Sequence, residues 1–206
     1  MIILKGYRIS IVRHGRTAGN DKGLYIGKTD LPLTEQGKDE LRALYEMYEY
    51  PRVHKVYSSP LERCVQTAEI LFPDKDITVV DDLKEMDFGV FEGLKAEDLV
   101  QLDSYKNWLK GGLDNPPPNG ESLRDMMVRC YTALNAIILD MMQEDATHAG
   151  VVTHSGILMN MMSCFGLPKM KPMEFACQMG FGYEILVNAN MWQNGNCFEI
   201  LGRIPQ

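Results

Sequence analysis

Two apolar runs in this chain each end in a histidine, and this arrangement restricts the fold more than any other feature. Tyr7-Arg8-Ile9-Ser10-Ile11-Val12 is followed by Arg13-His14-Gly15, and Gly150-Val151-Val152-Thr153 is followed by His154. Short apolar runs bounded in this way are consistent with buried strands. Ligands of open α/β sheets bind beyond the carboxyl ends of the strands, so we expect these two histidines to meet at one site.

The rest of the chain predicts strands that alternate with helices. Further strands are expected over 53–58, 77–80 and 149–153, and helices over 34–48 with Thr34 as the cap and over 155–165. A helix is also expected to begin at Ser59-Pro60-Leu61-Glu62, with Ser59 as N-cap, Pro60 at the first position and Glu62 completing a capping box. This alternation implies a mostly parallel α/β sheet.

Two segments depart from the alternation. Residues 93–145 are mainly helical, interrupted by the Pro-rich segment 115–120, with a long helix from about Glu121. We expect this segment to be an insertion that lies over the end of the sheet. The tail predicts an antiparallel hairpin over 182–187 and 197–201 with a turn at 194–196. The whole chain, 1–206, is therefore expected to form one α/β domain.

Charge and cysteine content exclude several classes of protein. The formal net charge is −7, which disfavours a general nucleic-acid or anionic-membrane surface. The five cysteines are scattered without a C-x-x-C pair, which indicates reduced thiols, no disulfide framework and a cytoplasmic protein. The first residues do not resemble a signal peptide, and the most apolar stretch, 150–167, is too short for a membrane span. Any anion site must be a local cluster of cations.

The residue types around His14 suit a phosphate ligand. Arg13 carries an always-charged planar fork that matches phosphate oxygens. Gly15 lets the backbone approach closely, and its N–H can donate to a phosphate oxygen. A neutral His14 has a lone pair available for attack. Arg63 is expected in the first turn of a helix, where a bound phosphate would explain a cation.

Six blocks together resemble the histidine phosphatase superfamily, in the branch of the phosphoglycerate mutases and small phosphomonoesterases such as α-ribazole-phosphate phosphatases. The resemblance covers nearly the whole chain and implies a phosphoglycerate mutase-like three-layer sandwich, mostly parallel with an antiparallel edge strand and a helical insertion over the active site. The blocks are Arg13-His14-Gly15-Arg16-Thr17-Ala18-Gly19-Asn20, Asp30-Leu31-Pro32-Leu33-Thr34-Glu35-Gln36-Gly37, Ser58-Ser59-Pro60-Leu61-Glu62-Arg63-Cys64-Val65-Gln66-Thr67-Ala68, Leu83-Lys84-Glu85-Met86-Asp87-Phe88-Gly89-Val90-Phe91-Glu92-Gly93, Gly120-Glu121-Ser122 and Val151-Val152-Thr153-His154-Ser155-Gly156.

The resemblance also implies roles for individual residues. His14 is the nucleophile that becomes phosphohistidine, and Glu85 is the proton donor. The residues expected to bind the phosphoryl group are Arg13, Gly15, Asn20, Arg63, His154 and Ser155. The chemistry alone leaves Glu85, Asp87 and Glu92 open as the donor, and the family pattern favours Glu85. Two arginines and a protonated His154 would neutralise the phosphoryl charge without a metal, so no metal and no cofactor is expected.

These observations predict a phosphoric monoester hydrolase of the histidine acid phosphatase type that acts on a small phosphorylated metabolite. Two alternatives remain, a phosphoglycerate mutase and a catalytically silent phospho-ligand binding protein. The expected partner is a small phosphate ester, with neither nucleic acid nor membrane, and the chain could be a monomer or a homodimer. Arg16 could be solvated or add an anion contact. Tyr25, Phe88 and Trp108 could stack a ring, and Trp108 could instead form the core of the insertion.

Overall fold

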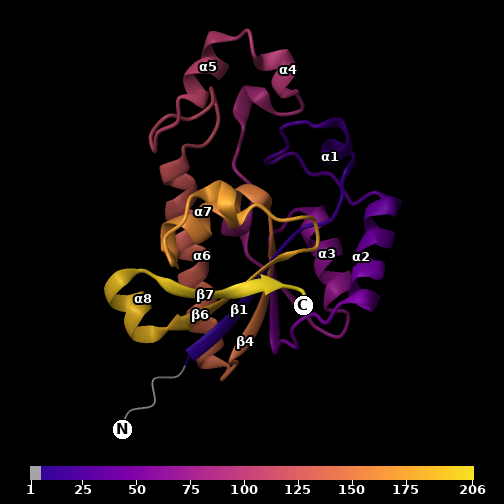
Figure 1. The fold of residues 1–206 in the computed structure, drawn as a ribbon, viewed down its shortest axis with the longest axis vertical. Coiled ribbons are helices and arrows are strands. Elements are labelled where there is room, and N and C mark those ends of the chain that lie inside the picture. The colour runs from indigo at the N-terminus through magenta and orange to yellow at the C-terminus, as the bar shows by residue number, and fades with distance from the viewer. Residues whose placement is uncertain (1–5) are drawn as a thin grey trace.

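The computed structural model describes residues 6–206, which form a seven-stranded sheet between two layers of helices (Figure 1). The strands lie in the order β3-β2-β4-β1-β6-β7-β5. The β1/β4, β2/β4, β2/β3 and β5/β7 pairs are parallel, whereas β6 runs antiparallel to both β1 and β7. The strands are β1 (Gly6–Arg13), β2 (Lys55–Ser58), β3 (Ile77–Val79), β4 (His148–Thr153), β5 (Gly166–Leu167), β6 (Gly182–Asn188) and β7 (Phe198–Ile204).

Successive side chains along β1 and β4 point alternately to the two helical layers. Ile9, Ile11 and Val151 face the larger core, which contains the buried sides of α6 (Leu123–Gln143) and α7 (Ser155–Phe165). Val12 and Val152 face the smaller core with α2 (Glu35–Met47) and α3 (Glu62–Leu71). This two-residue alternation is what buries both faces of a sheet between helices. The shorter helices are α1 (Ala18–Lys22), α4 (Ala96–Leu99), α5 (Asp103–Leu109) and α8 (Ala189–Gly195).

The central strand pair brings the two histidines together, as predicted. In the parallel β1/β4 register Arg13 lies opposite Thr153, so His14 and His154 leave the sheet at the same level. The N–H of His14 extends the ladder by donating to the Thr153 carbonyl at 2.9 Å. The prediction of Thr34 as a helix cap is also confirmed, because its hydroxyl accepts from the N–H of Gly37.

The predicted capping box at Ser59 is wrong. Helix α3 begins at Glu62, with Leu61 at the N-cap position and without a side-chain cap. The Ser59 hydroxyl instead lies 2.9 Å from Nε2 of His154 and only 3.4 Å from the N–H of Leu61. A buried imidazole in reach of this hydroxyl replaces the local capping contact that the sequence pattern suggests.

The helical insertion is shorter than predicted. Helix α6 belongs to the sandwich, because its residues Met126, Leu134 and Ile138 are buried in the larger core. Of residues 86–145, only 86–120, with α4 and α5, stand above the sheet, and we call them the upper lobe (Figure 1). The 3.6-residue periodicity of α6 does not distinguish a helix packed on a sheet from one in an insertion, which explains the error.

The C-terminal segment also differs from the prediction. β6 and β7 are antiparallel as expected, but α8 joins them in place of a turn at 194–196. The side chain of Asn188 caps this helix by accepting from the N–H of Asn190, and Trp192 on it is buried. A large indole with a place in the core favours the helix over a tight turn.

Candidate active site

His14, Arg63 and His154 form a buried cluster at the carboxyl ends of β1, β2 and β4. Their exposed fractions are 6%, 1% and 0%. The two imidazole rings meet edge to face with centroids 5.2 Å apart, and Nε of Arg63 donates to Nδ1 of His154 at 3.3 Å. The prediction that His14 and His154 meet at this edge of the sheet is therefore confirmed, and Arg63 lies beside them.

The backbone around His14 determines which of its nitrogens can react. Nδ1 lies 2.7 Å from the carbonyl oxygen of Gly15, which can only accept, so Nδ1 carries the proton. Nε2 therefore keeps its lone pair. Burial, with added effects of Arg63 and Arg13, lowers the pKa of His14 to about 3, so the ring stays neutral near pH 7.

His154 is neutral in the ligand-free protein, in contrast to the protonated form that the sequence suggested. The guanidinium of Arg63 can only donate, so Nδ1 of His154 accepts and Nε2 carries the proton toward Ser59. Burial, the neighbouring His14 and then Arg63 hold the pKa of His154 well below its ordinary value. A bound phosphoryl dianion would act in the opposite direction, because a nearby anion favours the charged imidazolium.

Arg63 is held by backbone as well as by His154. Its Nη1 donates to the carbonyl of Thr29 at 2.9 Å, and its Nη2 donates to the carbonyl of Gly27 at 2.8 Å. Three of the five N–H groups of a guanidinium are thereby occupied, and one remains on each Nη atom. These two groups remain available as donors to an anion.

Arg13 carries an unpartnered donor in a position to meet an anion. Its Nη1 donates to the Cys177 carbonyl at 2.7 Å, which fixes the side chain against the 176–181 loop. Its Nε is the one buried side-chain nitrogen or oxygen without a hydrogen-bond partner within residues 6–206. A buried donor without an acceptor is unfavourable, and a phosphoryl oxygen would satisfy it.

The structure separates the three candidate proton donors. Glu85 is buried at the N-terminus of α7, where its carboxylate accepts from the N–H groups of Met86 and Gly156, both at 2.9 Å. Burial raises the pKa of Glu85, which favours the protonated form that a general acid needs. Asp87 is paired with Lys28 on the surface at 2.7 Å. Glu92 accepts five hydrogen bonds from the backbone and a hydroxyl.

Arg129 is a site residue that sequence reasoning missed. It forms an ion pair with Glu121 at 2.6 Å and donates to the carbonyls of Asp82, Lys84 and Glu85. It thereby ties helix α6 to the segment that carries Glu85. The Gly120-Glu121-Ser122 motif marked Glu121, but its partner lies eight positions further along and belongs to no recognised block.

The remaining predicted ligands have partners within the protein. The N–H of Gly15 donates to the Thr67 hydroxyl at 2.9 Å, so a phosphate would have to compete for it. The Oδ1 atom of Asn20 accepts from the backbone and hydroxyl of Thr17, forming a capping box for α1. Ser155 begins α7 next to Gly156. Phosphate contacts of Gly15, Asn20 and Ser155 stay predictions.

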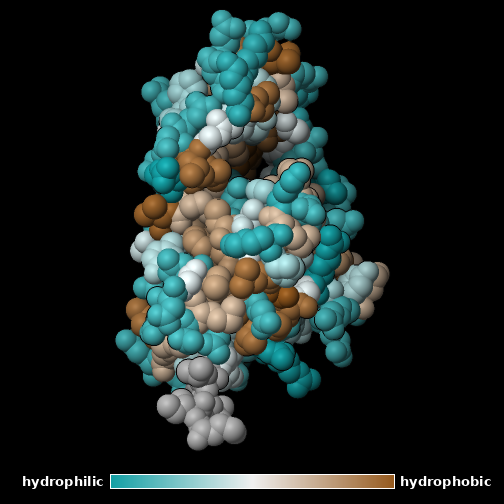
Figure 2. All heavy atoms as spheres, turned by 60° about the vertical axis from the view of Figure 1, so that its left-hand side comes forward, coloured by the Kyte–Doolittle hydropathy of each residue, from teal (hydrophilic) through white to brown (hydrophobic). Residues whose placement is uncertain are grey.

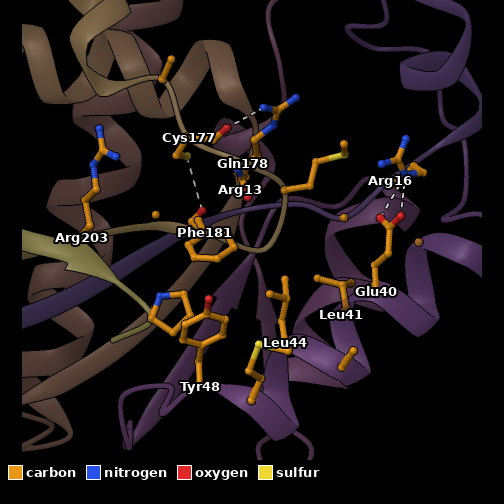
Figure 3. Close-up of a pocket in the computed structure, with 18 residues that line it drawn as sticks. Arg13, Arg16, Glu40, Leu41, Leu44, Tyr48, Cys177, Gln178, Phe181 and Arg203 are labelled. Carbon is orange, nitrogen blue, oxygen red and sulfur yellow. Dashed lines mark hydrogen bonds and ion pairs between the residues drawn. The ribbon is translucent and has the colours of Figure 1, made fainter.

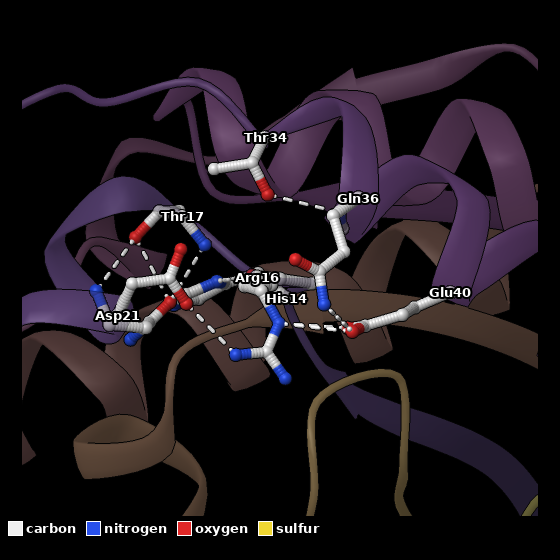
Figure 4. Close-up of polar contacts among 10 residues, drawn as sticks. His14, Arg16, Thr17, Asp21, Thr34, Gln36 and Glu40 are labelled. Carbon is white, nitrogen blue, oxygen red and sulfur yellow. Dashed lines mark hydrogen bonds and ion pairs between the residues drawn. The ribbon is translucent and has the colours of Figure 1, made fainter.

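Arg16 lies beside the site but is neutralised by acidic neighbours (Figure 4). Its Nε donates to both carboxylate oxygens of Glu40, at 3.1 and 3.0 Å, and its Nη1 donates to Asp21 at 2.9 Å. Asp21 and Glu40 belong to α1 and α2, so Arg16 joins these two helices.

A groove of about 1140 Å³ adjoins the site on the α2 side (Figure 3). Arg13 and Arg16 lie at one end, and its floor includes Leu41, Leu44 and Phe181. His14, Arg63, His154 and Glu85 do not line it, so the groove is separate from the catalytic cluster. Figure 2 shows a second hollow, beneath the upper lobe, with apolar residues around it.

The aromatic residues that could stack a substrate ring pack against the core of the upper lobe. Phe91 and Tyr105 are buried there together with Leu99, and Tyr25, Phe88 and Trp108 pack against them. Ring centroids of Tyr25 lie 5.1 Å from Phe88 and 5.7 Å from Trp108. These contacts assign Trp108 to the lobe core.

Over residues 6–206, His, Cys, Asp and Glu side chains do not gather in groups of three that could hold a metal ion. None of the helices in that range is long and apolar enough to cross a membrane.

Comparison with known proteins identifies the family. The model of the histidine phosphatase superfamily (branch 1) matches residues 9–193. An adenosylcobalamin/alpha-ribazole phosphatase of Salmonella typhimurium is 32% identical over 155 residues, which are 73% of this chain and 75% of the relative. The alpha-ribazole phosphatase structure from Shigella flexneri has a TM-score of 0.75 at 24% identity and 95% coverage of both chains. The Bacillus anthracis phosphoglycerate mutase structure has a TM-score of 0.77 at 17% identity, covering 96% of this chain and 92% of the mutase. The chain belongs to the histidine phosphatase superfamily.

Proposed function

We propose that this protein is a metal-independent phosphomonoesterase that hydrolyses a small phosphorylated metabolite through a phosphohistidine on His14. One observation carries the proposal: the Gly15 carbonyl holds the proton on Nδ1, so the lone pair of Nε2 is free within a cluster of cations. Arg13 with its unpartnered Nε and Arg63 with two free N–H groups supply the positive charge. Preorganised donors of this kind stabilise the charge of phosphoryl transfer.

The proposed reaction has two steps. In the first, Nε2 of His14 forms a bond to phosphorus as the ester P–O bond breaks, and the departing alkoxide takes the proton of Glu85. In the second, the Glu85 carboxylate takes a proton from water, whose oxygen attacks phosphorus as the P–N bond breaks. Inorganic phosphate leaves, and both side chains return to their starting protonation.

The substrate proposal comes from the relatives. The Salmonella relative is named an adenosylcobalamin/alpha-ribazole phosphatase. We propose a ribose-phosphate ester with an aromatic base as the first candidate substrate of this protein. The phosphoryl cluster would take the phosphate. Tyr25, Phe88 and Trp108, which are only partly buried against the lobe core, would take the base.

Hydrolysis of an aryl phosphate in excess EDTA, compared between the wild type and His14→Ala, tests the proposal. We expect phosphate release that survives EDTA and is abolished in the variant. Wild type quenched in alkali during turnover should also contain phosphate on a histidine, which survives base and is released by acid. Release that EDTA abolishes would contradict the mechanism. Transfer between phosphoglycerates without net phosphate release would favour a mutase, and phosphate binding without turnover would favour a silent binding protein.

A further inference from the structure

We propose that Glu92 is a positioning residue for the phosphoryl site, and that it acts through the 27–29 loop on Arg63. The inference rests on the proposed function, because it assigns Arg63 to the phosphoryl group. It goes further in assigning a task to a carboxylate that does not touch the cluster. Glu92 was one of three candidate proton donors in the sequence, and its contacts in the structure point to a different role.

Glu92 organises the loop by accepting its backbone N–H groups. Its Oε1 accepts from Gly27 at 2.9 Å, from Lys28 at 3.1 Å and from Phe88 at 3.2 Å. Its Oε2 accepts from the Thr29 hydroxyl at 2.6 Å and from the Thr29 N–H at 3.4 Å. Hydrogen bonds to an ionised acceptor are stronger than neutral ones, so this carboxylate fixes three consecutive residues.

The opposite side of the same loop holds the guanidinium. The carbonyls of Gly27 and Thr29 accept from the two Nη atoms of Arg63, so the loop lies between the Glu92 carboxylate and the Arg63 guanidinium. In the part of the chain that the structure describes, Glu92 accepts from the N–H of Gly27, Lys28 and Thr29 alike. Loss of this acceptor would free the loop to turn its carbonyls away from Arg63.

The packing at Gly27 leaves little room for another arrangement. A Cβ atom there would lie 1.8 Å from the Met86 carbonyl oxygen and 2.4 Å from Oε1 of Glu92. The loop thus lies directly on the segment that connects Glu85 to Glu92. Arg63 is 1% exposed, and burial disfavours its charge while Glu92 is among the carboxylates that favour it.

The test is a double-mutant cycle between Glu92→Gln and Arg63→Met, with inorganic phosphate as the ligand. Glutamine keeps the volume of the side chain, but its amide nitrogen donates and cannot accept a hydrogen bond. One of the two positions that accept from the loop in Glu92 would therefore present a donor to the loop's own donors. We expect Glu92→Gln to weaken phosphate binding and lower kcat/KM for an aryl phosphate by roughly 10- to 100-fold, as displaced positioning groups commonly do. In the Arg63→Met background the same change should have less than about a twofold effect, because coupled residues are non-additive.

Two further variants keep the test decisive. Thr29→Val removes the 2.6 Å contact but leaves the Thr29 carbonyl in place, so it should weaken phosphate binding in the same direction by a smaller factor, even if Glu92→Gln folds poorly. Asp114→Asn, an acid-to-amide change in an exposed ion pair with Arg124, is the matched control and should leave phosphate binding unchanged.

An equal effect of Glu92→Gln in both backgrounds would show general destabilisation and overturn the inference. So would wild-type phosphate affinity in Glu92→Gln. A wild type that neither binds phosphate nor hydrolyses an aryl phosphate is a distinguishable result, because it refutes the proposed function before any variant is compared, and the inference with it.

Discussion

His14 illustrates how one backbone carbonyl determines the chemistry of a side chain. The Gly15 oxygen selects the tautomer, and burial keeps the ring neutral by lowering its pKa to about 3. The sequence could predict a histidine at a strand end. It could not predict the tautomer, because the carbonyl that sets it depends on the turn after β1.

The depressed pKa of His14 predicts an acid-sensitive stability. Between about pH 6.5 and 3 the unfolded chain protonates this histidine and the folded protein does not, so the free energy of unfolding falls as the pH falls. At pH 5 this difference in protonation lowers the free energy of unfolding by about 2 kcal/mol. Urea unfolding at pH 8 and pH 5 should show a smaller loss for His14→Gln than for the wild type. Equal losses would contradict the assignment.

Glu85 should affect substrates according to their leaving groups. Glu85→Gln is expected to lower kcat/KM for an alkyl phosphate by about 10²- to 10⁴-fold, the usual contribution of a general acid. An aryl phosphate, whose leaving group needs less protonation, should lose much less. The wild-type alkyl rate should fall as the pH rises through the raised pKa of Glu85, because the donor must be protonated. The variant should lose this alkaline limb.

Asp87→Asn is the matched control for Glu85→Gln. Asp87 was an equal candidate from its sequence position, but it pairs with Lys28 at the surface. Its amide variant should keep the wild-type ratio of alkyl to aryl rates. A collapse of that ratio in Asp87→Asn, with Glu85→Gln unaffected, would exchange the two assignments. Sequence spacing alone could not separate them, because only burial and partners differ.

At the scale of elements, helix α6 links the sandwich to the site. Its side chain Arg129 crosses to three carbonyls of the 82–85 segment, so the helix fixes the position of Glu85 from outside the cluster. The sequence predicted a long helix here but placed it in the insertion. Knowing which face of α6 meets the sheet requires the tertiary contacts of Met126 and Ile138, which periodicity does not supply.

Arg129→Met should therefore affect both stability and catalysis. It leaves Glu121 without its cation and three carbonyls without a donor, which should lower the free energy of unfolding by roughly 2–4 kcal/mol. The alkyl phosphate rate should fall more than the aryl rate, whereas inorganic phosphate affinity should persist because Arg63 is untouched. Arg124→Met, an exposed arginine on the same helix, should change neither quantity. Equal behaviour of the two variants in denaturation and kinetics would refute this role.

At the scale of the whole molecule, the order of the strands places the site. The chain order predicted a mostly parallel sheet and the meeting of His14 with His154, and both follow from β1 lying next to β4. The position of the 27–29 loop against Arg63 was not predictable. It depends on Glu92, which lies about sixty residues further along the chain and has no local sequence signal for such a contact.

The upper lobe has a core of its own, and this predicts two levels of stability in one chain. Phe91, Leu99 and Tyr105 form a cluster separate from the two cores of the sandwich, joined to it at the base by hydrogen bonds such as Glu121 N–H to the Asp87 carbonyl. Regions with small cores open locally at lower free energy than central strands. Hydrogen exchange should therefore be faster in α5 than in β1 and β4.

Trp108→Ala should widen this difference, because Trp108 packs on three rings of the lobe and on Tyr25, and on neither core of the sandwich. Exchange of the α5 amides should accelerate, while the β1 and β4 amides should retain the wild-type rate. Urea should affect the α5 openings only weakly, since little surface is exposed in a local opening. If lobe and sheet amides exchanged with one common free energy in both proteins, the lobe would unfold only with the sandwich. That result would contradict the two levels of stability inferred from the separate cores.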